Sequence, residues 1–159
     1  MLLTEAVIEA QGRVRPMARH DVPVAAGLIA RLARHYDERP AIDAAGLEAD
    51  LLAGAPAFHG LVAERFGYVV GYALMTPGEG ASSAARTLEL HQLFVIEGSR
   101  GLGLGRALAG SVMDVARETG CGLIVARAHV ANIHARGFYG ALGFQPRDGV
   151  ATDFIMTLP

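Results

Sequence analysis

The residues with the clearest chemical potential form a glycine-rich segment, Glu-Gly-Ser-Arg-Gly-Leu-Gly-Leu-Gly-Arg, over residues 97–106. A β-type run precedes it, and apolar residues recur at helical spacing from Leu104 to Val115, which predicts a strand leading through this segment into a helix. The first N–H groups of a helix lack carbonyl partners, and glycines let a ligand approach them closely. With Arg100 and Arg106 beside these donors, the segment is predicted to bind a phosphate or pyrophosphate.

The same glycines would also suit a tight turn that packs a helix on a strand, or a dinucleotide site of an oxidoreductase. The G-x-G-x-x-G pattern is broken, because Leu108 or Arg106 stands where its third glycine is needed. All fourteen basic residues are arginine, so a P-loop lysine and a Schiff-base lysine are excluded.

Three polar residues, Glu89, His91 and Gln92, interrupt the apolar strand predicted over residues 87–95. Strict alternation would place Glu89, His91, Leu93 and Val95 on one face and Leu90, Gln92 and Phe94 on the other. Glu89 and His91 would then form a carboxylate–imidazole pair able to take a proton from an amine, directly or through water. The alternative is a Glu89 satisfied by an arginine and a His91 at an exposed strand end.

Asn132 and Tyr139 are seven positions apart in a predicted helix over residues 132–142, so they share one helix face. Ala135 lies between them and is small enough to admit a slender ligand. Asn132 also suits a helix N-cap, and Tyr139 could simply pack against the core.

These segments resemble the GNAT superfamily of N-acetyltransferases. Residues 100–105 fit its R/Q-x-x-G-x-G/A loop, and the likeness runs from about Val14 to the chain end. The resemblance implies the GNAT fold, an α/β three-layer architecture with a mixed, mostly antiparallel sheet of six to seven strands and about four helices. It also implies transfer of acetyl from acetyl-CoA to a primary amine by direct attack in a ternary complex, with a small-molecule amine preferred over a protein.

The resemblance further implies roles for individual residues. Tyr139 would protonate the leaving thiolate, Glu89 or His91 would relay the amine proton, and a backbone N–H near residues 93–95 would polarise the thioester carbonyl. The pantetheine arm would lie in a gap splayed from the strand over residues 123–130. The residues implied to contact the cofactor are Leu93, Phe94, Val95, Arg100, Gly101, Leu102, Gly103, Leu104, Gly105, Arg106, Asn132, Ala135 and Tyr139.

Within the superfamily, residues 28–38 look most like the polyamine and diamine branch. That branch carries an acidic pair where this chain has His91 and Gln92, which counts against a polycationic acceptor. Asp37, Glu38 and Asp43 could still attract a cation, although a solvated loop with a helix cap explains them as well. A non-catalytic acyl-CoA or amine sensor with the same fold is the alternative function.

The elements that must position these residues follow from periodicity and capping. Strands are expected over residues 14–17, 61–64, 68–75, 87–95, 123–130 and 154–158, helices from Asp21, from Asp43 and over residues 105–119 and 132–142, and a loop over residues 77–86.

The composition supports one domain over residues 1–159, with a core from about residue 14. A formal charge of −2 gives no general attraction to nucleic acid, and no apolar run is long enough for a membrane span. A cytoplasmic location is expected, since no signal peptide is visible. The single cysteine, Cys121, cannot form an internal disulfide, the histidines show no metal-ligand spacing, and a homodimer is possible.

Overall fold

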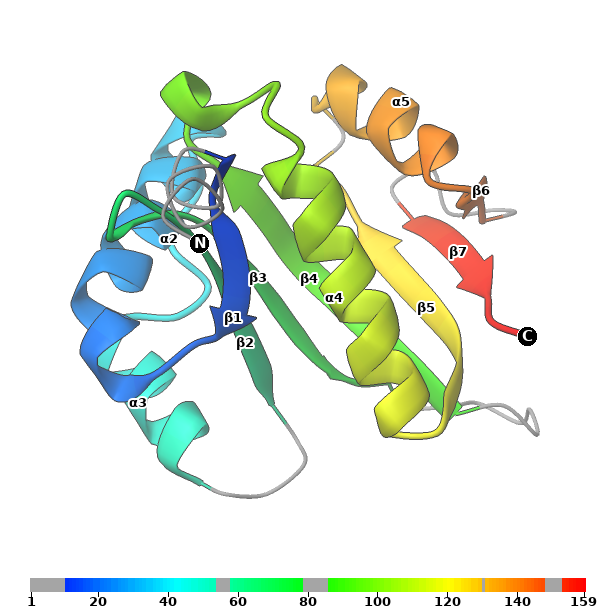
Figure 1. The fold of residues 1–159 in the computed structure, drawn as a ribbon, viewed down its shortest axis with the longest axis horizontal. Coiled ribbons are helices and arrows are strands. Elements are labelled where there is room, and N and C mark those ends of the chain that lie inside the picture. Colours follow the sequence, from blue (N-terminus) through cyan, green and yellow to red (C-terminus); the bar gives the residue numbers. More distant parts are fainter. Residues whose placement is uncertain (1–10, 54–57, 79–85, 130, 148–152) are drawn as a thin grey trace, which may run out of the picture.

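A computed structural model describes residues 11–53, 58–78, 86–129, 131–147 and 153–159. These form a seven-stranded sheet in the order β1-β2-β3-β4-β5-β7-β6, in which only β4 and β5 run parallel (Figure 1). The strands are β1 (Arg13–Pro16), β2 (His59–Arg65), β3 (Tyr68–Pro77), β4 (Arg86–Val95), β5 (Cys121–Arg127), β6 (Gln145–Pro146) and β7 (Asp153–Thr157).

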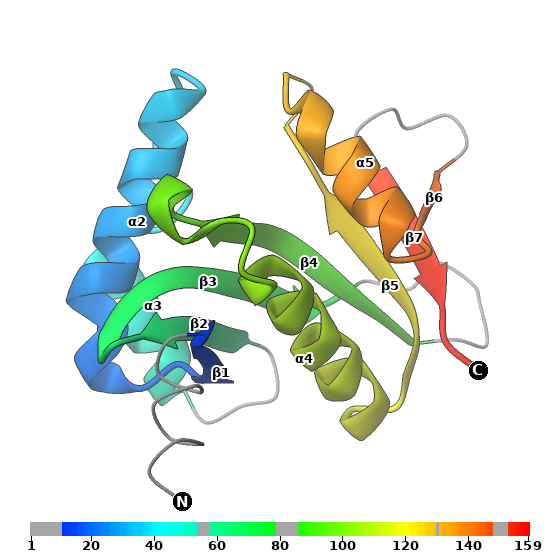
Figure 2. The ribbon, with the colours of Figure 1, turned by 45° about the horizontal axis from the view of Figure 1, so that its top comes forward.

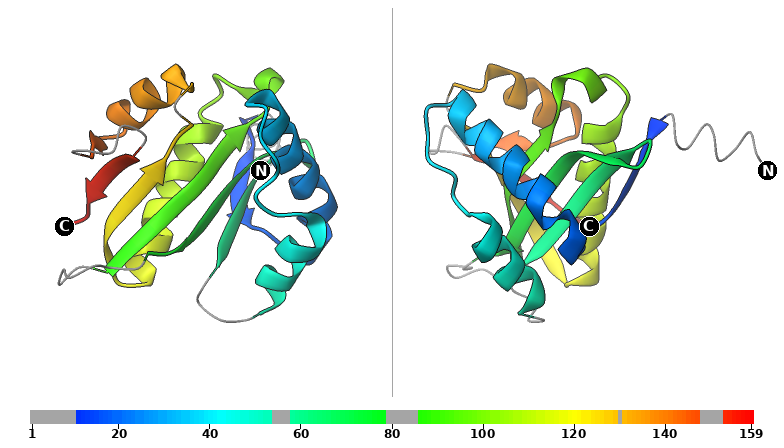
Figure 3. Two further views of the ribbon diagram at one scale, coloured as in Figure 1. Left: turned by 180° about the vertical axis from the view of Figure 1, so that it is seen from behind. Right: turned by 90° about the vertical axis from the view of Figure 1, so that its left-hand side faces the viewer.

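Helices cover both faces of the sheet, which confirms the three-layer α/β prediction. Helices α2 (Val22–His35) and α3 (Ala44–Leu52) lie on one face, and α4 (Leu104–Glu118) and α5 (Ile133–Ala141) lie on the other (Figure 3). Two short 3-10 helices, η1 (Arg19–Asp21) and η2 (Glu97–Ser99), were not predicted. None of the helices in these ranges is long and apolar enough to cross a membrane.

Each helical layer buries its own apolar cluster against the sheet. On the α4 side, Leu104, Leu108 and Val112 recur at the four-residue spacing of one helix face and are almost completely buried. On the α2 side, Ile29 and Leu47 pack against Val62, all three inaccessible to solvent. Burial of these side chains ties the helices to the sheet.

The parallel pairing of β4 with β5 stops before β4 ends. The last pair is Leu90 with Ala126, whereas β4 continues to Val95. Beyond that pair the two strands diverge into a V, and α4 packs on both of them (Figure 2). The predicted splay is therefore present; β5 ends at Arg127, and residue 130 of the run predicted for it lies outside the described residues.

A β-bulge overturns the predicted faces of β4. Leu74 of β3 pairs with Gln92, but the next residue, Met75, pairs with Leu90, so His91 is an extra residue. As a result Leu93 and Val95 pack with Leu90 on the α4 side instead of sharing a face with Glu89. The prediction from strict alternation is wrong because it assumes that each residue of β4 pairs with one residue of β3 along the whole strand.

Two other local predictions have different outcomes. Asp43 caps α3, accepting a hydrogen bond from the Gly46 N–H at 2.8 Å, as predicted. Asp21 stands before α2, but its carboxylate binds Arg15 and the Ala18 N–H instead of capping the helix. The guanidinium outcompetes a cap because a bidentate charged pair is the stronger interaction. The predicted loop between β3 and β4 falls largely on residues 79–85, outside the described residues.

Candidate active site

The glycine loop presents a row of backbone donors at the start of α4. Gly101 and Gly103 have φ angles of 76° and 82°, a left-handed conformation that favours glycine. The first amide with a backbone acceptor is that of Ala107, which donates to the Gly103 carbonyl at 2.9 Å. Within the described part of the chain, the N–H groups of residues 101–106 have no acceptor. Such a concave set of donors at a helix N-terminus binds anions.

Arg100 and Arg106 are both exposed residues at this loop, but they make different contacts. The Nε of Arg100 donates to the Val95 carbonyl at 2.8 Å, and its guanidinium lies 5.8 Å from the centre of the Phe94 ring. Arg100 therefore ties the loop to the end of β4. Arg106 lies in the first turn of α4, beside the free amides.

The diverging part of β4 presents donors toward the V. The Ile96 N–H donates to the Val70 carbonyl of β3 at 2.9 Å. Because residues of an antiparallel strand turn their N–H groups alternately to opposite neighbours, Phe94 also faces β3, while Leu93 and Val95 turn theirs away from it. The Leu93 and Val95 amides thus face the opening that β5 leaves, and the Phe94 amide does not.

Helix α5 forms the wall of the V on the α4 side. Asn132 caps it, accepting a hydrogen bond from the Ala135 N–H at 3.1 Å. Ala135 and Tyr139 are both buried on the same face, as their spacing predicts. The Tyr139 ring packs 5.2 Å from Phe144 and 5.5 Å from Phe154, and burial raises its pKa to about 12. Its hydroxyl is therefore protonated at neutral pH.

On the opposite, α2-facing side of the V, β3, β4 and β5 bring four polar side chains together. His91 Nε2 lies 2.6 Å from Thr76 Oγ1 and 4.0 Å from Glu89 Oε2. Arg127 lies 3.5 Å from the same Glu89 oxygen. Burial lowers the pKa of His91, with the Arg127 charge acting in the same direction and Glu89 opposing it. The bulge therefore keeps Glu89 and His91 together, although the alternation used to predict the pair does not hold.

A second group of contacts, here called the α2–β5 bridge, joins the ends of α2 and β5. Tyr36 and His129 stack with ring centres 4.2 Å apart and planes inclined by 17°. His129 Nε2 lies 3.0 Å from Glu38 Oε1, and the Ala131 N–H donates to its Nδ1 at 3.0 Å. Glu38, considered above as a cation-attracting residue, is thus paired within the protein.

The sequence model of the acetyltransferase (GNAT) family matches residues 27–144, about three quarters of the chain. The chain belongs to this family. A curated relative is the L-amino acid N-acyltransferase MnaT of Escherichia coli K12, 35% identical over 100 residues. The alignment covers 63% of this chain and 56% of MnaT, so the chain spans little more than half the length of that relative.

Solved structures share the fold over nearly the whole GNAT chain. The yncA protein of Salmonella typhimurium, solved with its cofactor acetyl-CoA, is 26% identical with a TM-score of 0.71, covering 93% of this chain and 94% of yncA. The paiA N-acetyltransferase of Thermoplasma acidophilum, in complex with coenzyme A, is 15% identical with a TM-score of 0.71, covering 92% and 98% of the two chains. At that identity, the likeness to paiA shows the fold alone.

Four polar residues of these two groups of contacts were not singled out from the sequence: Tyr36, Thr76, Arg127 and His129. Arg127 and His129 interrupt an apolar run in the same way as Glu89 and His91 do, so the same signal was available for them. Thr76 and Tyr36 carry no local signal, because their partners are distant in the sequence.

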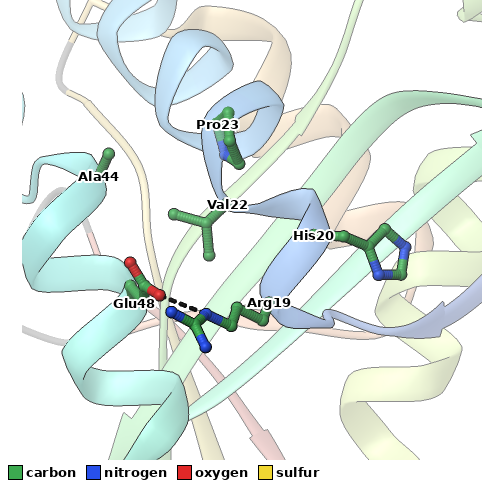
Figure 4. A pocket seen from close by; sticks show the side chains of 6 residues that line it. All are labelled: Arg19, His20, Val22, Pro23, Ala44 and Glu48. Atoms are coloured by element: carbon green, nitrogen blue, oxygen red, sulfur yellow. Dashed lines mark hydrogen bonds and ion pairs between the residues drawn. The ribbon is translucent and has the colours of Figure 1, made fainter.

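A separate hollow of about 560 Å³ lies between η1 and α3 (Figure 4). Arg19 and Glu48 form an ion pair across it, and Val22, Pro23 and Ala44 contribute apolar walls. Its lining includes neither the glycine loop of residues 101–106 nor the Glu89–His91 pair, so it is separate from the candidate active site. Within the described ranges, no group of three or more His, Cys, Asp or Glu side chains is placed to hold a metal ion.

Proposed function

We propose that this protein is an acetyl-CoA-dependent N-acetyltransferase that acetylates the primary amine of a small molecule by direct attack in a ternary complex. The observation that carries the proposal is the continuity between the unpartnered amides of residues 101–106 and the unpaired edge of β4. A pyrophosphate fits the first feature and an extended pantetheine arm fits the second. Both features border the V, and the Glu89–His91 pair lies at its base, where the pairing of β4 with β5 ends.

The donor, acetyl-CoA, supplies an activated thioester, and the chain's own groups bind and orient it. The loop amides and Arg106 neutralise the pyrophosphate, while Arg100 holds the loop against β4. Asn132 and Ala135 border the path of the arm. An N–H of Leu93 or Val95 is positioned to stabilise negative charge that develops on the thioester oxygen.

Proton transfer is divided between the two faces of the sheet. The Tyr139 hydroxyl, on the α4 side, donates a proton to the departing thiolate. The Glu89–His91 pair, on the α2 side, takes a proton from the acceptor ammonium. Donor and acceptor therefore reach the V from different faces, which supports direct attack in a ternary complex.

The Tyr139→Phe variant tests the assignment of the acid. We expect turnover, measured as thiol release, to fall about a hundredfold, since general acid–base groups contribute roughly 10²- to 10⁴-fold. The affinity for coenzyme A and the melting temperature should change little, because the ring keeps its contacts with Phe144 and Phe154. Equal turnover in the variant would remove Tyr139 from its role.

A panel of amines, screened by thiol release, tests the function itself. The activity in MnaT's name makes L-amino acids the first class to include, followed by polyamines and larger amines. Calorimetry with acetyl-CoA separates the alternatives: binding without thiol release from any amine would indicate a sensor, and absence of binding would refute the proposal.

A further inference from the structure

His91 uses one ring nitrogen for contacts within the protein. Its Nε2 lies 2.6 Å from the Thr76 hydroxyl oxygen and 4.0 Å from a carboxylate oxygen of Glu89. Within the described part of the chain, Nδ1 has no partner. The His91 side chain is 38% exposed, and of its two ring nitrogens it is Nε2 that contacts from β3 and β4 hold in place.

These contacts select one tautomer of the neutral ring. A neutral imidazole carries one N–H and one lone pair, and an ionised carboxylate can only accept hydrogen bonds. The negative charge of Glu89 beside Nε2 favours the proton on that nitrogen, and the Thr76 oxygen can accept a hydrogen bond from it. The lone pair is then left on Nδ1.

Glu89 itself is engaged elsewhere. Its Oε2 forms an ion pair with Arg127 at 3.5 Å, and its side chain is 23% exposed, less than that of His91. A proton placed on Glu89 would cancel this ion pair, whereas a proton on His91 would add a positive charge beside the carboxylate. The charged groups facing the ring are Glu89 on β4 and Arg127 on β5; Thr76, on β3, is neutral.

We infer that His91, through Nδ1, is the proton acceptor of this site, and that Thr76 and Glu89 are positioning residues that hold the proton on Nε2. The inference rests on the proposed function and divides the roles within the Glu89–His91 pair. In the step, the N–H bond of the acceptor ammonium breaks and the proton binds Nδ1. The electron pair stays on the amine nitrogen, which becomes the nucleophile, and Glu89 stabilises the imidazolium.

Nitrogen NMR of the free protein tests the tautomer without any cofactor. The wild type should show a protonated Nε2 on neutral His91. The Thr76→Val variant keeps the side-chain shape but cannot accept the hydrogen bond, so its tautomer population should shift toward Nδ1–H, and Thr76→Ser should restore it. A wild-type ring protonated mainly at Nδ1, or an unchanged population in Thr76→Val, would overturn the inference.

Kinetics supply the second readout. By analogy with the hydrogen-bonded partners of metal-bound histidines, whose loss costs about 10- to 100-fold, turnover should fall roughly tenfold in Thr76→Val and recover in Thr76→Ser. In Glu89→Gln the lower limb of the pH–rate profile should move to lower pH, because the imidazolium loses its carboxylate. Thr87→Val is the matched control, since the Thr87 hydroxyl has no partner within the described residues. An unmoved limb in Glu89→Gln would refute the role given to Glu89.

The two proposals fail in distinguishable ways. An inactive wild type with the expected tautomer would refute the acetyltransferase function and leave the arrangement around His91 standing. If the wild type is active but Thr76→Val leaves the His91 tautomer unchanged and Glu89→Gln leaves the pH–rate profile unchanged, this inference alone is refuted.

Discussion

Replacing Gly103 with alanine measures what the glycine loop contributes. Gly103 stands at the N-cap of α4 with φ 82° and ψ 4°, and a Cβ built on it would meet no atom within 4 Å. The cost of Gly103→Ala therefore comes from the left-handed backbone alone, about 1–2 kcal/mol. At roughly 2–4 °C per kcal/mol for a chain of this size, the melting temperature should fall by about 2–8 °C if the loop keeps its conformation.

The cost of the left-handed backbone can instead reduce the affinity for the ligand. If the alanine loop relaxes to negative φ in the free protein, the amides of residues 101–106 turn away and the ligand must restore them. Coenzyme A affinity would then fall by roughly 5- to 30-fold, which is the same 1–2 kcal/mol expressed as a binding constant. We expect the loss of stability and the loss of binding free energy to add up to about that amount.

Thermal unfolding of the free protein and calorimetry with coenzyme A make both measurements. Gly110→Ala is the control: it lies within α4, a Cβ there also meets nothing within 4 Å, and its φ is not positive. This control should gain about 0.5–1 kcal/mol from helix propensity and bind coenzyme A as the wild type does. A Gly103→Ala protein with wild-type stability and wild-type affinity would show that the left-handed loop is not required.

Three further outcomes follow from other contacts. Hydrogen bonds from Arg15 lower the pKa of the buried Asp21 in the folded protein. The ionised carboxylate therefore contributes fully to the free energy of unfolding above its unfolded pKa of about 4, and this contribution is lost as the pH falls through the lower folded pKa. Asp21→Asn should thus cost about 2–3 kcal/mol in urea unfolding at pH 7, and progressively less as the pH is lowered below about 4; a cost that does not fall with pH would contradict this. Gly71→Ala places a Cβ 2.6 Å from the Phe94 carbonyl oxygen and should destabilise the protein by about 3 kcal/mol, whereas an unchanged melting temperature would disprove the close approach. His129→Phe keeps an aromatic ring in the α2–β5 bridge but removes the two polar contacts of His129. Amide hydrogen exchange in the last turn of α2 should therefore become faster. Unchanged exchange would mean that the stacked rings alone stabilise this turn.

Periodicity and capping located the main strands and helices because each depends on residues close in the sequence. The hairpin of β2 and β3, the α4 stripe and the Asp43 cap are of this kind. The two-residue strand β6 was missed, since so short a run has no measurable alternation. The bulge at His91 was missed because it depends on the register with β3, which no property of β4 alone encodes.

In the candidate site, too, the features that depend on neighbouring residues could be predicted, and those that depend on distant residues could not. The donors of residues 101–106 and the Asn132 cap follow from local patterns, and the structure shows both. The contact of Thr76 with His91 and that of Tyr36 with His129 join residues far apart in the chain, so only the folded sheet reveals them. The resemblance to the polyamine branch and the roles of individual site residues stay predictions.

The early end of the β4–β5 ladder divides the sheet into two blocks, β1 to β4 and β5 to β7. Among the described residues, five pairs, from Arg86 with Cys121 to Leu90 with Ala126, join the blocks by strand pairing. An extended ligand that fills the V would link the two blocks, because it can form hydrogen bonds with β4 where β5 no longer pairs with it. Since it binds the folded state alone, a loaded protein should be stiffer and melt later than an empty one.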